Sequence, residues 1–293
     1  MNDVLLKATV PGIRAFAAIT TNLVEDARQR HNCYPTAIAA LGRTMTGALL
    51  LAANLKTEES ITIRVTGDGP LEEIVVDADN HGNVRGYVNN PQTHLPLKNE
   101  KLDVGGAIGK GHIHVTRFTG LKAPFTGSIE LVSGEIAEDI AQYLLFSEQT
   151  PSTIILGVKV QPDLTVTAAG GMLIQALPDA EEEIIEKIEN NISQLPSITA
   201  MLEAGLDAQG MIEKAFAGLP ILYGGETPLK FQCRCSRDRV EKMLISLGEE
   251  ELINLLNEQK AEIKCHFCSQ FYHFNQNELD ALLQEVRRMQ KTL

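Results

Sequence analysis

The sequence predicts an α+β protein with a core domain of mixed helices and strands, a helical linker and a small C-terminal α+β domain. Three observations lead to this prediction. The chain has 293 residues, more than a single hydrophobic core usually serves. Strand and helix periodicities alternate without long gaps over residues 1–178, and four of the five cysteines fall late in the chain. We expect the core domain at 1–178, the linker at 179–228 and the small domain at 229–293.

The core domain is expected to begin with a strand and then two helices, the second opened by Pro35. Residues 60–66 alternate apolar and polar side chains, which is typical of a half-buried strand. A glycine-containing turn then joins two strands that can pair as a hairpin. The expected elements are strands at 13–20, 60–66, 73–78, 83–88, 112–118, 125–132, 152–160 and 164–169, and helices at 22–31, 36–55 and 136–146.

The composition changes after Pro178. Residues 179–293 carry 20 acidic and 12 basic side chains, net −8, against 18 and 14, net −4, before them. Four of the first five residues after Pro178 are Asp or Glu, and acidic side chains favour a helix amino terminus. An apolar stripe at helical spacing follows and must cover another surface; it consists of Ile184, Ile185, Ile188, Ile192 and Leu195. Glycines and prolines then break the chain repeatedly, so we expect short helices on a linker.

The four late cysteines form two tight pairs. Cys233 and Cys235 flank one residue, 29 residues follow, and Cys265 and Cys268 flank two. Four thiolates are the number that a closed tetrahedral zinc site requires. Residues two apart in an extended segment project to the same side, so the first pair can share one ion. The turn of the second pair can present two sulfurs to that ion from the opposite side. The sequence therefore predicts one Zn²⁺ per chain, held by all four cysteines in a zinc-binding C-terminal domain.

About sixty residues are marginal for folding on apolar burial alone, so this domain is expected to depend on its metal. Its expected elements are a short strand from 229, helices at 239–246 and 249–257, a strand from 262, a strand at 271–274 and a helix from 276. His266 and His273 are alternative ligands, but four sulfurs already complete the coordination shell.

Charge and composition limit the partners. The net charge of −12 gives poor electrostatic attraction for nucleic acid or an anionic membrane. The apolar run at 46–55 is too short to span a bilayer, and no signal peptide is visible, so we expect a cytoplasmic protein. Cys33 stands apart beside His31; a catalytic pair is conceivable there, but a buried thiol at a helix junction is the favoured interpretation.

Four segments together resemble a known family. They are Phe231–Arg237, Cys265–Cys268 with Tyr272 and Phe274, Tyr143–Ser152, and Gly170–Pro178. In these motifs the chain is similar, over essentially its whole length, to the bacterial redox-regulated heat-shock holdases of about thirty-three kilodaltons, the heat-shock protein 33 family. Cys233, Cys235, Cys265 and Cys268 match the zinc ligands and redox-switch thiols of this family one by one, whereas Cys33 lies outside the set.

The resemblance implies an ATP-independent chaperone rather than an enzyme. Such a protein is inactive when reduced and zinc-bound. Oxidative stress converts the thiols to disulfides, releases zinc and unfolds the C-terminal domain and linker, and a homodimer then binds unfolding client proteins. We expect disulfides between Cys233 and Cys235 and between Cys265 and Cys268. No ATP site is expected, because the glycine run at 105–111 lacks the pattern of a phosphate-binding loop.

Two other functions remain open at the level of sequence. A zinc-stabilised thiol–disulfide oxidoreductase would use the same cysteines in catalytic turnover, but a thioredoxin-like motif leads into a helix, whereas the segment after Cys268 favours a strand. A zinc-bearing protein-interaction module would need a defined protein partner.

Overall fold

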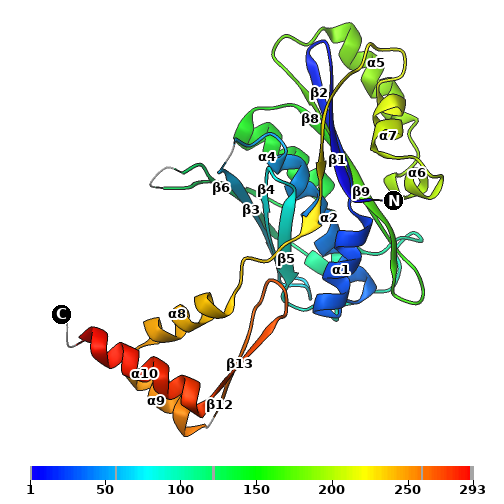
Figure 1. Ribbon diagram of the computed structural model, residues 1–293. Coiled ribbons are helices and arrows are strands. Elements are labelled where there is room, and N and C mark those ends of the chain that lie inside the picture. Colours follow the sequence, from blue (N-terminus) through cyan, green and yellow to red (C-terminus); the bar gives the residue numbers. More distant parts are fainter. Residues whose placement is uncertain (1, 57, 121–122, 259, 291–293) are drawn as a thin grey trace. The chain divides into compact units, whose positions relative to one another are not determined.

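The computed structural model describes residues 2–56, 58–120, 123–258 and 260–290. The chain forms two compact units, Met1–Gln232 and Cys233–Leu293, which we call unit 1 and unit 2 (Figure 1). Both units combine helices and strands. The predicted α+β fold class is therefore confirmed.

Two sheets form the framework of unit 1. The first is antiparallel, with the strand order β10-β1-β2-β9-β8. The second has the order β11-β5-β4-β3-β6-β7 and is antiparallel except where β11 joins it. The strands are β1 (Val4–Val10), β2 (Ile13–Ile19), β3 (Ser60–Gly67), β4 (Glu73–Asp79), β5 (Asn83–Val88), β6 (Gly111–Phe118), β7 (Phe125–Glu130), β8 (Ser152–Val160), β9 (Val166–Ala176), β10 (Leu222–Pro228) and β11 (Lys230–Phe231).

Helix α2 (Pro35–Ala52) lies at the centre of the main hydrophobic core. Small residues let it approach its neighbours closely: a Cβ at Gly47 would lie 2.5 Å from Cδ1 of Ile140. Among the described residues, α2 is the one helix long and apolar enough to cross a membrane, yet 89% of it is buried inside the protein. Such burial suits the core helix of a globular fold. Helices α1 (Thr21–His31), α3 (Val104–Ile108) and α4 (Ala137–Glu148) complete this core.

The first sheet is covered on both faces. Along β2, Phe16 and Ala18 belong to the core around α2, whereas Ala15 and Ala17 belong to a second hydrophobic cluster. This second cluster is closed by α5 (Glu182–Ser193), α6 (Ile198–Glu203) and α7 (Ala208–Ala215), which Figure 1 shows beside the sheet. Ile188 of the apolar stripe is buried there. The residues of the expected linker are thus part of unit 1, where they cover its first sheet.

Two strands were not anticipated by the sequence. Strand β1 precedes the first expected strand, and β10 lies in the glycine-rich stretch assigned to the linker; the two pair with each other, with Val4 opposite Pro228. The strand expected at 164–169 is longer and runs as β9 to Ala176. These elements depend on sheet pairing between distant segments, which local periodicity does not report.

Strand β11 lies at the C-terminal end of unit 1. It pairs in parallel with β5 over two residues, and the backbone N–H of Gln232 donates to the carbonyl of Val84 at 2.8 Å. The guanidinium of Arg30 lies 4.8 Å from the centre of the Phe231 ring. The chain is therefore fixed to unit 1 up to the residue that precedes Cys233.

Unit 2 is a β-hairpin with three helices. Its elements are α8 (Arg237–Leu247), α9 (Glu249–Asn257), β12 (Lys260–Lys264), β13 (Phe271–Asn275) and α10 (Gln276–Gln290). Its buried apolar cluster is small and consists of Val240, Leu244, Leu252, Ala261, Phe274, Leu279, Leu282, Leu283 and Val286. The two helices, the two later strands and the final helix expected here are confirmed, whereas the strand expected from 229 belongs to the second sheet of unit 1 as β11.

Candidate metal centre

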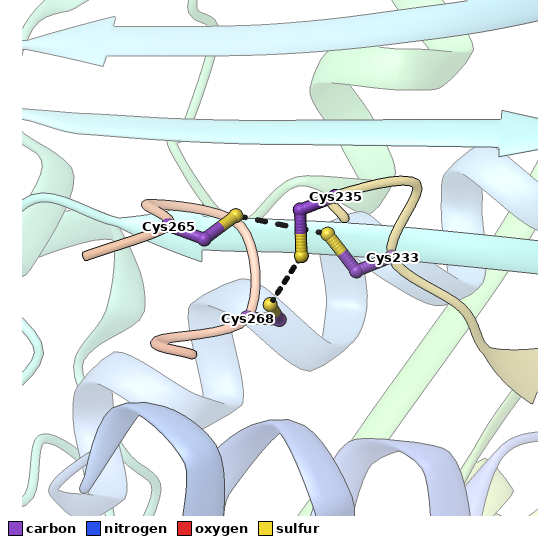
Figure 2. Close-up of side chains that lie close together, drawn as sticks. All are labelled: Cys233, Cys235, Cys265 and Cys268. Atoms are coloured by element: carbon purple, nitrogen blue, oxygen red, sulfur yellow. Dashed lines mark hydrogen bonds between the residues drawn. The ribbon is translucent and has the colours of Figure 1, made fainter. Parts of the chain in front are cut away.

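The four late cysteines converge in unit 2. Cys233 and Cys235 lie in the extended segment before α8, and Cys265 and Cys268 lie in the turn between β12 and β13. The four sulfur atoms all lie within 4.8 Å of one another. Figure 2 shows the four sulfurs facing a common centre. Cys233 Sγ lies 3.7 Å from Cys265 Sγ, and Cys235 Sγ lies 3.4 Å from Cys268 Sγ.

This spacing fits a tetrahedral metal site. With Zn–S bonds of about 2.3 Å, ideal tetrahedral geometry separates the sulfurs by ~3.8 Å, close to the distances found. The donor set is also appropriate, because thiolates favour zinc and other soft metal ions over magnesium or calcium. The residues present can therefore hold one metal ion.

Local structure places each cysteine pair. After Cys235 the chain turns directly into α8, and the hydroxyl of Ser236 caps the helix by accepting from the backbone N–H of Arg239 at 3.3 Å. The second pair is held by the β12–β13 hairpin. Its turn is closed by hydrogen bonds from the Cys265 N–H to the Gln270 carbonyl at 2.9 Å and from the Ser269 N–H to the Cys265 carbonyl at 2.8 Å.

Hydrogen-bond donors surround the sulfurs. The backbone N–H of Cys235 donates to the Cys233 sulfur, those of Phe267 and Cys268 to the Cys265 sulfur, and that of Gln270 to the Cys268 sulfur. The hydroxyl of Tyr272 donates to Cys235 Sγ at 3.1 Å. Donors directed at sulfur stabilise the thiolate form, which is the form that binds metal.

The pKa values of the clustered thiols shift in different directions. Burial raises the pKa of Cys233, but the hydrogen bonds from Cys235 and the neighbouring thiols outweigh it, so that the pKa falls from 9.0 to about 7. Burial raises the pKa of both Cys265 and Cys268. Without a cation, four adjacent thiolates would repel one another. A divalent ion removes that repulsion, so metal binding and deprotonation are coupled.

The alternative ligands and the isolated thiol lie elsewhere. Neither His266 nor His273 belongs to the cluster of ligand atoms found in the described residues, and His273 Nδ1 lies 3.3 Å from a Glu262 carboxylate oxygen. Cys33 is buried in unit 1, where burial raises its pKa to about 12. The interpretation of Cys33 as a buried core thiol is confirmed.

The sequence did not indicate what Tyr272 and Arg237 contact, because both entered the analysis only as members of the motifs that carry the family resemblance. The guanidinium of Arg237 bonds the His273 carbonyl at 3.1 Å and the Glu278 carboxylate at 2.7 Å, and lies 4.3 Å from the centre of the Phe274 ring. It thus joins the start of α8 to β13 and α10. The strand pattern at 271–274 indicated which side chains share a face, but not what they contact.

Comparisons with known proteins agree with this architecture. The sequence model of the family described as "Hsp33 protein" matches residues 3–275. The "33 kDa chaperonin" of Desulforamulus reducens is 50% identical over 290 residues, covering 98% of this chain and 99% of its own length. That of Geobacter sulfurreducens is 47% identical over 272 residues, covering 92% and 90%.

A solved structure has the same fold. The crystal structure of the 33 kDa chaperonin, or heat shock protein 33 homologue, of Thermotoga maritima superposes with a TM-score of 0.92 at 36% identity. The match covers 97% of this chain and 99% of that one. With a family match over almost its entire length, this chain belongs to the Hsp33 family of chaperones.

Proposed function

We propose that this chain is an ATP-independent holdase switched on by oxidation of Cys233, Cys235, Cys265 and Cys268. One observation carries the proposal: four thiols from segments separated by 29 residues meet within 4.8 Å, in the unit with the smaller apolar core. Because the chain belongs to a chaperone family, we infer that the proteins it binds as clients are unfolding proteins. The protein would act in the cytoplasm as a homodimer under stress, without enzymatic turnover and without nucleic acid or membrane partners.

In the reduced state the four sulfurs would hold one Zn²⁺. The ion would supply the positive charge that lets the thiolates lie side by side. Structural zinc is worth roughly 10–16 kcal/mol of apparent folding free energy in small domains. In the described part of unit 2 the apolar cluster contains only nine buried residues, so the fold of this unit would depend on the ligands remaining reduced.

Oxidation by peroxide would remove the ligands in pairs. One thiolate attacks a peroxide oxygen and becomes a sulfenic acid as hydroxide leaves. A second thiolate then attacks that sulfur and releases a second hydroxide, so a disulfide forms while peroxide is reduced. We propose the pairs Cys233–Cys235 and Cys265–Cys268. Such short loops contribute only roughly 1.5–2 kcal/mol each, and they leave Cys235 and Cys265 unconnected, so unit 2 would unfold.

The surface that receives clients would become free in a second step, in which α5 detaches from the first sheet of unit 1 after unit 2 has unfolded. Helix α5 carries the apolar stripe, and its Ile184, Ile185 and Ile188 lie in the cluster against the first sheet. Release of this helix would expose apolar surface on both the helix and the sheet. Large exposed apolar surfaces are typical of protein-binding sites.

The test follows zinc and clients together. Reduced protein is treated with peroxide at raised temperature, without nucleotide, while zinc release and suppression of client aggregation are recorded in parallel. We expect both to rise together in wild type and in the Cys33→Ser control. Strict dependence on ATP, or full activity while zinc remains bound, would contradict the proposal. Peptide mapping checks the pairing, and a Cys235–Cys265 disulfide in a still protected unit 2 would contradict the unfolding step.

A further inference from the structure

We propose that unit 1 contains a binding site for a small amphipathic cation, a molecule with an apolar body and a protonated primary amine, in the cavity between α4, the first sheet and α5. A bound molecule holds α5 against the sheet. The binding itself does not depend on the proposed function, whereas its effect on activation rests on that function.

The cavity has the size and the apolar lining of a small-molecule site. Its volume is about 490 Å³, and sites for small organic molecules usually measure about 300–1,000 Å³. Helix α5 contributes Ile185, Ile188 and Ile192 to the lining, and the first sheet contributes Ile13 and Ile174. The cavity can therefore bury the apolar body of a small molecule.

One polar group in the lining lacks a hydrogen-bond donor. Gln142 of α4 lines the cavity, and its side-chain oxygen Oε1 is buried and accepts no hydrogen bond from the described residues. Buried acceptors in proteins are nearly always paired, so this oxygen favours a ligand that brings an N–H group. Glu138 also lines the cavity, one helical turn before Gln142, so the amide and the carboxylate are neighbours on one face of α4.

The charge of the cavity selects a cation. Its lining contains Glu138 and, from α5, Glu189, and none of the described residues that line it is Lys, Arg or His. Both glutamates are exposed, so their carboxylates lie where the cavity meets solvent, and neither forms an ion pair with another described residue. A primary ammonium has three N–H donors. It can face the carboxylates and donate to Gln142, whereas the carboxylate of a fatty acid would be repelled.

The ligand bridges two parts of unit 1 that the proposed function separates. Leu145 and Gln142 belong to α4, Ile185 and Glu189 belong to α5, and all four line the same cavity. A molecule that contacts both helices binds the arrangement in which α5 is docked. By linkage, ligand at about ten times its Kd lowers the population with α5 detached by about elevenfold. The ligand therefore delays activation without contacting the cysteines.

Titration calorimetry of full-length, reduced, zinc-loaded protein tests the site. The probes are octylamine, octanoate and octanol, which share an apolar chain and differ in the head group. We expect saturable binding of octylamine, and binding of octanoate that is weaker by about tenfold or more because its charge is repelled. Equal affinity for octylamine and octanoate, or no saturable binding of octylamine, would overturn the proposal.

Substitutions test whether the two carboxylates select the amine. In the double variant Glu138→Gln, Glu189→Gln, the affinity for octylamine should fall about fivefold, because two exposed charge pairs are lost, and the affinity for octanol should not change. The matched control is Glu183→Gln, at an exposed residue of α5 outside the cavity; it should bind octylamine as wild type does. Unchanged octylamine affinity in the double variant would contradict the choice of a cation.

Hydrogen exchange tests the effect on α5. With octylamine at about ten times its Kd, exchange of the α5 amides through detachment should slow by about elevenfold, and exchange in α8 of unit 2 should not change. Binding that leaves α5 exchange unchanged would overturn the fastening of this helix. After peroxide treatment, octylamine should delay client protection more in wild type than in the double variant. If octylamine binds and slows α5 exchange but oxidised wild type protects no clients, the holdase function alone fails.

Discussion

The two units of this chain differ in the size of the apolar core that stabilises each of them. Unit 1 packs two sheets around α2, in which sixteen of the eighteen residues are buried. Unit 2 surrounds nine buried apolar residues with three helices and one hairpin, and four sulfurs meet where its chain begins and turns. Apolar burial cannot easily be reversed by a small oxidant, whereas metal ligation by thiolates can. If the proposed function holds, this difference would make unit 2 sensitive to redox conditions and leave unit 1 stable.

Removal of the metal should give the largest effect and should be confined to unit 2. A strong zinc chelator, or Cys265→Ser, removes a contribution of roughly 10–16 kcal/mol, far more than the small apolar cluster can replace. Hydrogen exchange followed by mass spectrometry should show loss of protection in α8, α9 and α10, with α2 and β3 unchanged. Persistent protection of α10 in metal-free protein would contradict the contrast between the units.

The reciprocal perturbation addresses the core of unit 1. Leu41 of α2 is fully buried, and Leu41→Ala should lower the free energy of unfolding of unit 1 by about 2–5 kcal/mol through lost burial and a cavity. Zinc affinity should stay unchanged. Leu247→Ala, at a side chain that is 51% exposed, is the matched control and should change stability by less than ~0.5 kcal/mol. A drop in zinc affinity for Leu41→Ala would show that the two units are energetically coupled.

The smallest effect concerns the cysteine of unit 1. Burial raises the pKa of Cys33 from 9.0 to about 12, so its thiol ionises first in the unfolded chain as the pH rises. Its contribution to stability is complete below about pH 9 and is lost as the pH rises towards 12. The stability difference between wild type and Cys33→Ala should therefore shrink by roughly 1 kcal/mol between pH 9 and pH 10.

Urea unfolding at these two pH values measures the effect, with zinc content as the internal reference. Cys33→Ala should retain wild-type zinc, because Cys33 belongs to the core of unit 1 and not to the sulfur cluster. A stability difference that does not depend on pH would show that the thiol is not protected from ionisation by burial.

Local patterns predicted most elements of the core but not the pairing of distant strands. The alternation in β3 and the helical stripe in α5 are visible in sequence because each depends on residues a few positions apart. Strand β10 contains Gly224, Gly225 and Pro228, residues that usually break regular structure. It forms a strand because β1, more than two hundred residues earlier, offers an open edge, and no local signal carries that information.

The candidate site was more predictable than the fold around it. Ligand number and spacing pointed to Cys233, Cys235, Cys265 and Cys268, and these four sulfurs converge in the structure. The identity of the ion, the disulfide pairing and the domain boundaries stay predictions. The contact of Tyr272 with Cys235 depends on the register of a hairpin and on the path of a segment 37 residues away, so residue types alone could not give it.

The short strand β11 sets what an unfolded unit 2 would become. The chain is fixed to unit 1 through Gln232. An unfolded unit 2 would therefore be a flexible chain of about sixty residues, attached to unit 1 at that residue like a polymer grafted to a surface. A flexible chain of this length has a root-mean-square reach on the order of 40 Å. Any partner bound by the grafted segment would be kept near unit 1 at an effective concentration in the millimolar range, so weak contacts on the two parts would add up to durable capture.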